Sequence, residues 1–248
     1  MSGQVRASVC MAAYNGSRWI GEQIESILAD LGPEDELVVV DDKSTDNTAD
    51  VVAAIGDPRI RLMRSEINER YVRTFGKAAA LARGQYIFLA DQDDIWVPGR
   101  TAKMIDALGK TAMVAGNVAL FGGPAENAPW SLRARDSNRR LANIVGVMVG
   151  YRPYYGCAMG FRRDFADVVL PMPRFLYESH DLWMALAGNL AGEMTHLGEP
   201  VLYRRLHEDN ETPRHWRRLD RILKARWMLL RAFVTAGFRL RQRSRRAA

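Results

Sequence analysis

Cysteine and long apolar runs are what this sequence has least of. Its 248 residues include only Cys10 and Cys157, and both lie in apolar, strand-like contexts. Two such residues make neither a disulfide framework nor a zinc site, so we interpret them as buried free thiols in a reducing compartment. No apolar run approaches the roughly 20 residues that span a bilayer. Residues 1–13 lack the basic start and apolar core of a secretory signal, and we expect a cytoplasmic protein.

The two common phosphate-binding loops are also missing. The first apolar run is followed by Tyr14-Asn15-Gly16, where a dinucleotide-binding protein would carry Gly-x-Gly-x-x-Gly. No Gly-x-x-x-x-Gly-Lys-[Ser/Thr] loop occurs, which excludes P-loop chemistry. A two-component receiver domain is about half this length and would leave the acidic residues 91–94 without a role.

What is present suits one α/β domain with an appendage. Apolar residues make up 48% of the chain and charged residues 26%, which is enough to bury a large core. The net charge of +6 hides an asymmetry, because residues 214–248 carry twelve Lys and Arg against one Asp. The rest of the chain therefore contains more acidic than basic residues, and the tail is strongly basic.

Strand and helix patterns alternate along the chain. The apolar runs predict strands at 7–13, 36–40, 59–63, 85–89, 113–121 and 201–204. Helical spacing predicts helices after a Ser17 cap, after a Ser44 or Asp46 cap, and at 68–82, 98–108 and 182–190. Residues 122–138, rich in Gly, Pro and charge, predict a loop over a site. This alternation favours a doubly wound, mostly parallel sheet flanked by helices.

The densest group of acids follows the strand predicted at 85–89. Asp91, Asp93 and Asp94 lie within four residues, where ligands bind in an open α/β sheet. Such close anions raise one another's pKa values unless a cation or hydrogen-bond donors neutralise them. We interpret the group as a Mg²⁺ or Mn²⁺ site. The alternative is a solvated turn with an Asp helix cap, against which the apolar Ile95-Trp96 argues.

Four ordered motifs together resemble the inverting GT-A glycosyltransferases of family 2. They are residues 9–16 (VCMAAYNG), 39–48 (VVDDKSTDNT), 90–96 (ADQDDIW), and His180-Asp181 with the later Tyr203-Arg204-x-x-His207-x-x-Asn210. The resemblance implies a GT-A domain over 1–212, with a nucleotide-sugar half (1–110) and an acceptor half (111–212). The pattern of the remaining residues predicts a basic amphipathic helical tail over 213–248. The form of residues 91–96 is most similar to the bacterial rhamnosyltransferase-like branch, which makes cell-surface polysaccharide.

The resemblance also implies a donor site. Tyr14 would stack on a pyrimidine base beside the backbone of Ala12 and Ala13, and Asp42 would accept the base N3–H of uracil or thymine. The metal would be held by Asp93 and His207, while the donor would also contact Arg70, Asp91 and Gln92. Helix capping by Asp42, a surface role for Arg70 and a simple loop role for His207 are the alternatives.

On the acceptor side the resemblance implies that Asp181 is the general base. A single displacement needs a carboxylate opposite the leaving group, within reach of the acceptor hydroxyl. The alternative is an ordinary carboxylate at a helix N-terminus, where the dipole would keep it ionised. His180 would orient its neighbour, and Gly156 and Cys157 would line the acceptor side, where small side chains allow close approach.

Two positions depart from the family pattern. Lys43 stands where relatives usually carry Gly or a small residue, and Arg70 stands where closer relatives often carry Gly. The difference at Lys43 has little bearing on the proposed chemistry. The difference at Arg70 leaves undecided which residue contacts the diphosphate.

The tail carries Trp216, Leu219, Leu223, Trp227, Leu230 and Val234 at helical spacing between arginines. Such a helix is typical of one lying on an anionic membrane, here through residues 214–246. Packing on the body is the alternative, and nucleic acid is not expected because no recognition motif accompanies the charge.

These observations predict a transferase that moves a hexosyl unit from a nucleotide sugar onto a glycan or lipid-linked acceptor. The expected donor is dTDP-L-rhamnose, with a UDP-hexose second, and the expected place is the inner face of the cytoplasmic membrane. A catalytically inactive nucleotide-sugar-binding module is the alternative.

Overall fold

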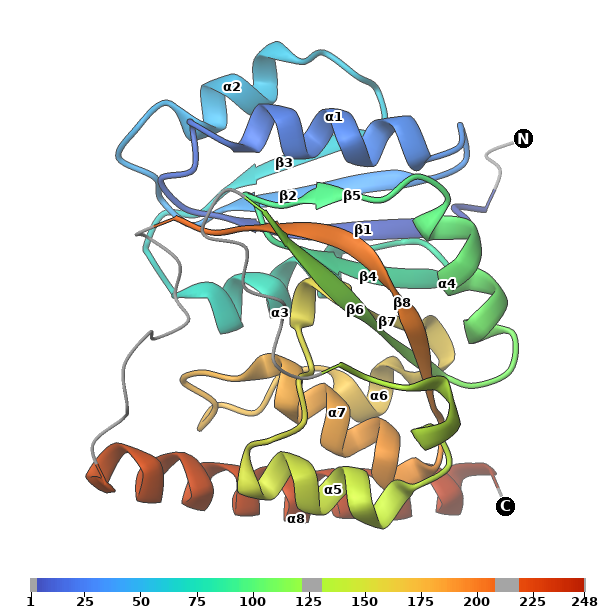
Figure 1. Cartoon of the computed structure of the whole chain (residues 1–248). Coiled ribbons are helices and arrows are strands. Elements are labelled where there is room, and N and C mark those ends of the chain that lie inside the picture. Colours follow the sequence, from blue (N-terminus) through green and yellow to red (C-terminus); the bar gives the residue numbers. More distant parts are fainter. Residues whose placement is uncertain (1–3, 122–130, 208–218, 248) are drawn as a thin grey trace.

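The alternating apolar runs form one curled, mixed sheet with helices on both faces, as the computed structural model shows for residues 4–121, 131–207 and 219–247 (Figure 1). Its strand order is β3-β2-β1-β4-β7-β6-β8-β5. The strands are β1 (Ala7–Ala13), β2 (Glu36–Asp41), β3 (Ile60–Arg64), β4 (Tyr86–Ala90), β5 (Ile95–Trp96), β6 (Met113–Phe121), β7 (Met159–Arg162) and β8 (Met194–Arg205).

The helices follow the predicted alternation through the first half of the chain. They are α1 (Ile20–Asp30), α2 (Thr48–Ala54), α3 (Tyr71–Leu81), α4 (Arg100–Leu108), α5 (Arg140–Val149), α6 (Ala166–Val169), α7 (His180–Ala191) and α8 (Leu219–Ala247). Of the loop predicted at 122–138, residues 122–130 lie outside the described residues, and 134–136 form a single 3-10 turn.

Two of the predicted helix caps are wrong. The residue before α1 is Trp19, not Ser17, because the chain makes a further turn in which the Trp19 and Ile20 N–H groups donate to Gly16 O. The residue before α2 is Asn47, and its side chain makes no capping bond. Asp46 still serves this helix start, since its carboxylate accepts the N–H of Thr48 at 3.0 Å.

The sheet is mostly parallel, as predicted, with an antiparallel insertion. β1 pairs in parallel with β2 and β4, β2 with β3, and β6 with β8. β7 lies antiparallel between β4 and β6, and β5 is antiparallel to β8. The parallel set β3-β2-β1-β4 brings the carboxyl ends of β1, β2 and β4 to one edge, which is where the sequence places its acidic and Tyr-Asn-Gly loops.

The period of two along the strands produces two cores, one on each sheet face. Val9, Met11, Val39 and Phe88 pack with α1, α2 and α4, whereas their neighbours Cys10, Val38, Val40, Ile87 and Leu89 pack with α3, α7 and α8. Side chains alternate across a strand, so each β-strand contributes to both cores. Cys10 and Cys157 are buried and unpaired, as predicted.

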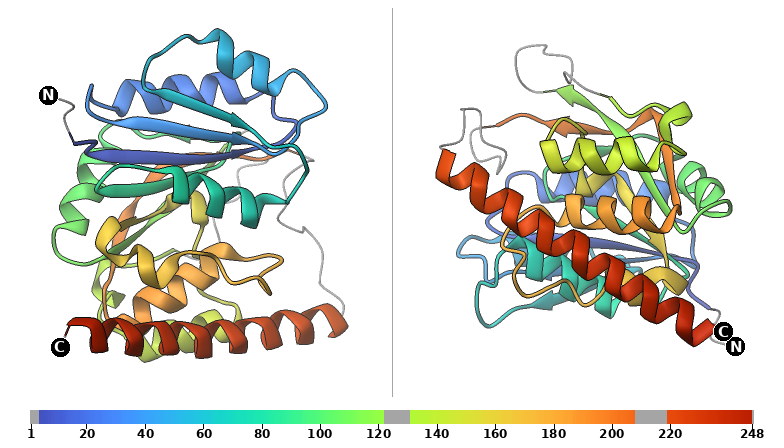
Figure 2. Two further views of the ribbon diagram at one scale, coloured as in Figure 1. Left: turned by 180° about the vertical axis from the view of Figure 1, so that it is seen from behind. Right: turned by 90° about the horizontal axis from the view of Figure 1, so that it is seen from below.

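Helix α8 runs along the base of the molecule, on the side away from α1 and α2 (Figure 2). Four of its buried residues, Met228, Leu229, Ala232 and Ala236, belong to the same core as α7. The predicted tail helix therefore forms, and it packs on the body. Within the described residues, no helix is long and apolar enough to cross a membrane.

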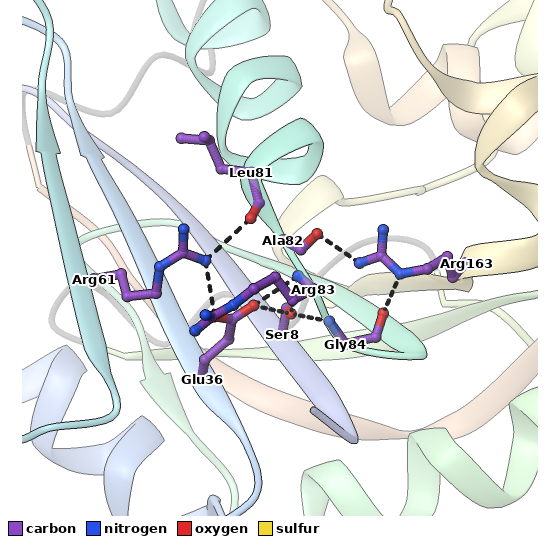
Figure 3. A network of polar contacts seen from close by, with 8 residues as sticks. All are labelled: Ser8, Glu36, Arg61, Leu81, Ala82, Arg83, Gly84 and Arg163. Atoms are coloured by element: carbon purple, nitrogen blue, oxygen red, sulfur yellow. Dashed lines mark hydrogen bonds and ion pairs between the residues drawn. The ribbon is translucent and has the colours of Figure 1, made fainter. Parts of the chain in front are cut away.

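A buried carboxylate joins strands and helix at the sheet edge opposite the candidate site. Glu36 is 3% exposed and accepts hydrogen bonds from Ser8 Oγ and Arg83 N at 2.7 Å each, and from the guanidinium groups of Arg61 and Arg83 at 2.9 and 2.8 Å (Figure 3). Beside it, Arg163 donates to the carbonyls at the end of α3. Burial opposes the charge of Glu36, but these donors outweigh it and lower its pKa.

We expect Glu36→Gln to lower the free energy of unfolding by about 3 kcal/mol, because a buried pair loses one partner. The measurement is urea denaturation. Because its folded pKa is below its unfolded value, the wild-type advantage is present above the unfolded pKa near 4.5 and lost as pH falls through the folded pKa. The matched control is Glu199→Gln, an exposed partner of Lys103, which should leave the midpoint unchanged. Equal midpoints for both variants would contradict the role of Glu36.

Candidate functional site

Three loops are tied together at the carboxyl ends of β1, β2 and β4. The side-chain amide of Gln92 accepts the N–H of Tyr14 at 2.8 Å and donates to the Tyr14 carbonyl at 3.0 Å. A Cβ at Gly16 would lie 2.2 Å from Gln92 Oε1, so any other residue here would displace the Gln92 amide from Tyr14. The Asn15 carboxamide accepts the N–H of Thr45, which joins the β2 loop to the other two. Gln92 thus positions the loop that carries Tyr14.

Tyr14 presents its ring at the mouth of this edge, with 46% of the residue exposed, as a stacking platform requires. The carbonyl of the adjoining Ala13 already takes part in a hydrogen bond of the fold, because it accepts the N–H of Asp42 at 2.7 Å. Ala12 lies next to it, half-buried at the end of β1. The stacking role of Tyr14 stays a prediction.

Asp42 is 3% exposed and faces the start of α3. Its two carboxylate oxygens accept the backbone N–H groups of Glu69 and Arg70 at 2.8 Å each. The sequence offered two roles, base recognition and helix capping, and these bonds are of the capping kind. Each carboxylate oxygen keeps a second lone pair, so recognition of a base N3–H also stays a prediction.

Strained backbone concentrates in the loops of this edge. Among the described residues other than glycine, only Asn15, Lys43, Arg70 and Ser179 have positive φ, at 49°, 63°, 69° and 61°. Two of them are the departures from the family pattern, and the strain supplies a physical reason for glycine there. Arg70 is the most unfavourable, because φ 69° with ψ 155° is a region that suits glycine. Its side chain is exposed and makes no hydrogen bond within the described chain.

Replacing Arg70 by Gly should raise the free energy of unfolding by about 1 kcal/mol, since relief of strain exceeds the added entropy of the unfolded chain. Arg70→Ala is the matched control, because it removes the same side chain and keeps the strain. Urea denaturation measures both. Equal stabilities for the two variants would contradict the strain. If Arg70 also contacts a diphosphate, both variants should bind donor more weakly by the same factor.

The acidic loop after β4 carries three neighbouring carboxylates in two groups, Asp93 beside His207, and Asp91 with Asp94 beside Cys157. Asp93 Oδ2 lies 2.7 Å from Nε2 of His207, which β8 delivers to the same edge. Burial, together with the charge of Asp93, raises the pKa of Asp91 to about 6, and burial with the charges of both neighbours raises that of Asp94 well above its usual value. Asp94 is 1% exposed, and its Oδ2 has no hydrogen-bond partner.

This donor set fits a divalent cation. A carboxylate with an imidazole, as in the Asp93–His207 pair, suits Mn²⁺, and carboxylates with water suit Mg²⁺. Burial is the main cause of the raised pKa values of Asp91 and Asp94, and the charges of the neighbouring acids add to it, so a bound cation would favour the ionised carboxylates. The carboxylates of Asp91 and Asp94 also lie within 4.8 Å of one another and of Cys157 Sγ. Asp93 and His207, the two residues to which the sequence assigned the metal, are in contact in the structure.

Asp181 lies in the first turn of α7, half-buried, with Oδ1 accepting the N–H of Leu182 at 2.8 Å. Its pKa is raised to about 6 by burial, with the charge of Asp91 adding to the shift. Burial outweighs the dipole of the helix start and raises the pKa, but a carboxyl group with a pKa of about 6 is still ionised at neutral pH. A carboxylate with a pKa near neutrality suits a general base.

His180 points away from these acids and into the core. Its ring stacks on Phe75 with centroids 4.5 Å apart, it is 7% exposed, and burial lowers its pKa to about 4. A Cβ at Gly156 would lie 2.2 Å from His180 Nε2, so the space beside this glycine is already filled by the imidazole. Cys157 is 2% exposed behind Asp91 and Asp94. The acceptor-side role of all three stays a prediction.

Two cations beside the acids received no role from the sequence. Arg204 lowers the pKa of Asp91, Asp94 and Asp181 by its charge and lies over the Tyr155 ring at 5.3 Å. Arg100 is 1% exposed beneath the loop, donates to Leu89 O and Cys157 O, and lies 3.9 Å from the Trp96 ring.

Both arginines carry a sequence signal that could have been read. Arg204 is the last residue of the strand predicted at 201–204. Arg100 lies at the start of the helix that follows the three carboxylates, where a buried charge needs partners.

Comparison with known proteins connects this arrangement to a family. Residues 8–170 match the family model described as "Glycosyl transferase family 2". The protein "Succinoglycan biosynthesis protein ExoO" of Rhizobium meliloti (strain 1021) is 43% identical over 96 residues, which is 39% of this chain and 28% of that protein. The E. coli protein "UDP-Glc:alpha-D-GlcNAc-diphosphoundecaprenol beta-1,3-glucosyltransferase WfgD" is 33% identical over 101 residues, 41% of this chain and 40% of that one.

Among solved structures, that of S. aureus TarS 1–349 in complex with UDP-GlcNAc superposes with a TM-score of 0.64 at 19% identity. The superposition covers 83% of this chain and 60% of that chain, and it confirms the GT-A fold expected from the sequence. In each of these three comparisons the chain spans less than two thirds of its relative's length.

Proposed function

The chain belongs to glycosyl transferase family 2, and from that premise we propose a metal-dependent inverting transfer of a hexosyl unit from a nucleotide sugar. The acceptor is a glycan or lipid-linked sugar of bacterial cell-surface polysaccharide. The observation that carries the proposal is the meeting of Asp91, Asp93, Asp94 and His207 with Asp181 at one edge of the sheet. The names of the relatives favour a UDP-hexose as donor, with dTDP-L-rhamnose second.

In this proposal the chain's own residues bind the donor and move one proton. Tyr14 stacks on the base, Asp42 accepts its N3–H, and Asp91 contacts the sugar or ribose. Asp93 and His207 hold the cation, which when bound neutralises charge on the nucleoside diphosphate. Asp181 accepts the proton of the acceptor hydroxyl as that oxygen bonds to the anomeric carbon. The bond from this carbon to the diphosphate oxygen breaks, its electron pair leaves with the diphosphate, and the anomeric configuration inverts.

The acceptor and the location belong to the same proposal. An acceptor carried on a lipid diphosphate places the enzyme at the inner face of the cytoplasmic membrane, held through residues 214–246. Support comes from the basic, apolar character of α8 and from the acceptor in the WfgD name.

A thermal-shift screen of nucleotide sugars with and without Mn²⁺ tests the donor assignment. A ligand that binds only the folded state raises the melting temperature by mass action. We expect a UDP-sugar to stabilise the protein only when Mn²⁺ is present, and AMP to have no effect. Slow metal-dependent release of UDP without acceptor would exclude the inactive binding module. Stabilisation by every nucleotide equally, or by none, would contradict the proposal.

A further inference from the structure

Helix α8 has two apolar faces, of which the protein uses one. The buried face consists of Ala225, Met228, Leu229, Ala232 and Ala236. Six other apolar residues are 43–79% exposed, namely Leu219, Leu223, Trp227, Leu230, Val234 and Phe238. At 3.6 residues per turn this second set forms a stripe on the side of the helix opposite the buried set. The stripe predicted from the sequence therefore forms, and it faces away from the body; its first member, Trp216, lies outside the described residues.

Helix α5 repeats this arrangement next to α8. Its buried side includes Ile144 and Val147, whereas Leu141, Val145 and Val149 form an outward stripe and are 80%, 54% and 63% exposed. The helices are joined where Arg226 Nη2 donates to Val149 O at 2.7 Å. Both lie at the base of the molecule, and both are visible from below (Figure 2). We call the two exposed stripes, on the neighbouring helices α5 and α8, the apolar base.

The charge around this base is almost entirely positive. In α8, residues 219–247 carry nine Lys and Arg against Asp220 alone. The segment that leads into α5 adds four exposed arginines, Arg133, Arg135, Arg139 and Arg140. Its one acid, Asp136, is 7% exposed and bound to Arg152. The apolar base is thus bordered mainly by cations, of which Arg243 is paired with Asp167 of the neighbouring α6.

We propose that α5 and α8 together form a docking face for an anionic lipid leaflet, with the two stripes inserted among the acyl chains and the arginines against the headgroup phosphates. An exposed apolar stripe bordered by Lys and Arg, with Trp and Phe among its members, is the chemistry of an interfacial helix. A second copy of this chain is a poorer occupant, because apposing two such faces brings like charges together. The contribution of α5 is new, since the sequence pointed only to the tail.

This docking face gives the candidate site a direction, and that consequence rests on the proposed function. The carboxyl ends of β1 and β2 and the start of α8 lie on the same side of the molecule (Figure 1). With the base on the leaflet, the site opens sideways, parallel to the membrane. A sugar on a lipid diphosphate would then approach the site along the leaflet surface instead of from bulk water.

The test is co-sedimentation of the full chain with vesicles of phosphatidylcholine alone or mixed with phosphatidylglycerol. The α5 variant is Leu141→Gln with Val145→Gln and Val149→Gln, and the α8 variant is Leu223→Gln with Trp227→Gln. The matched control, Met63→Gln with Ile67→Gln, removes exposed apolar residues elsewhere. We expect each face variant to bind mixed vesicles roughly 10- to 100-fold more weakly, and the control to bind as the wild type does.

Salt and lipid composition complete the test. Wild-type binding should weaken at high salt and be much weaker on phosphatidylcholine alone, because each cation near an anionic surface is screened within a Debye length. An α5 variant that binds like the wild type would overturn the two-helix face. A second outcome would also overturn it: no vesicle binding, together with self-association in sedimentation velocity that the face variants abolish. That result would assign the face to a second copy of this chain.

The vesicle assay contains no donor and no acceptor, so its outcome is separate from that of the proposed reaction. Melting temperatures of all variants should match the wild type, since every substituted side chain is exposed. Vesicle binding without any nucleotide-sugar binding would refute the transferase and leave the docking face intact. Nucleotide-sugar binding without vesicle binding would do the reverse.

Discussion

Asp181→Asn should slow glycosyl transfer by roughly 10² to 10⁴ while leaving donor and metal affinity nearly unchanged. The amide keeps the shape of the side chain and can still accept the N–H of Leu182, but it cannot take a proton from the acceptor. Single-turnover transfer separates the chemical step from binding, which Mn²⁺ and UDP titrations measure. Asp106→Asn on the exposed face of α4 is the control and should have no effect. Equal loss of donor binding in Asp181→Asn would place this carboxylate at the nucleotide.

The pH dependence of the wild type follows from the same side chain. The base must be ionised to act, and its pKa is raised to about 6, so the rate of the chemical step should rise with pH up to about 6 and then level off. In Asp181→Asn this rise should disappear from the residual rate. A wild-type rate that is flat between pH 5 and 8, while donor binding stays constant, would assign the base to another group.

Stability should change in the opposite direction to activity. The folded pKa of Asp181 lies above its unfolded value of 3.8, so the wild type has to keep a half-buried charge above that range. Asp181→Asn should therefore be more stable than the wild type at pH 7 by about 1 to 2 kcal/mol. The difference should shrink as pH falls from 6 toward 4, because the wild-type carboxyl becomes neutral. Urea denaturation across this range measures it.

The first half of the fold could be predicted from the sequence because each signal there is local. The apolar runs at 7–13, 36–40 and 85–89 are short, mostly buried and followed by polar turn residues, so β1, β2 and β4 and their loops could be predicted. The carboxyl ends of parallel strands share an edge, which is why the clustering of residues 14–16, 41–46 and 91–94 was also predictable.

In the second half the strand at 113–121 and the helix at 182–190 were predicted, but other elements were not, because they depend on tertiary contacts. Helix α5 contains Gly146 and a run of β-branched valines, a composition that does not favour a helix, and its burial against α7 decides the outcome. β7 has four residues and exists by pairing with β4 and β6. The first part of β8 was missed because Pro200 interrupts it, and the strand accommodates this proline at the irregular pairing with Asn117.

In the candidate site, too, residue types could be predicted from the sequence, whereas side-chain contacts could not. The acids and His207 could be chosen from their residue types and order, but whether a side chain faces solvent or core is a matter of packing. His180 and Asp181 are adjacent in sequence, yet one stacks on Phe75 in the core and the other lies among the acids. The two-faced α8 is a similar case, since Ala225, Ala232 and Ala236 are too small to signal a buried face.

Asp93→Ala should abolish metal-dependent donor binding while the fold survives. Burial is the main cause of the raised pKa values of Asp91 and Asp94, and the charge of Asp93 adds to it. Removing this anion lowers that repulsion, which favours the metal-free protein. The substitution also removes the contact between Asp93 and His207, whose loss costs about 1 kcal/mol. The two effects oppose each other, so the free energy of unfolding without metal should change by less than about 1 kcal/mol.

The effect on the cation should be much larger, because a carboxylate ligand is lost along with its charge. We expect Mn²⁺ affinity, followed by the paramagnetic resonance signal of the free ion, to fall at least roughly 10²-fold, and UDP binding in the presence of Mn²⁺ to fall with it. His207→Ala should weaken Mn²⁺ binding in the same direction, and Asp50→Ala, an exposed acid paired with Arg64, should not. If Mn²⁺ and Mg²⁺ bind Asp93→Ala as tightly as the wild type, the cation is not held by Asp93, and Asp91, Asp94 and Cys157 become the group to test.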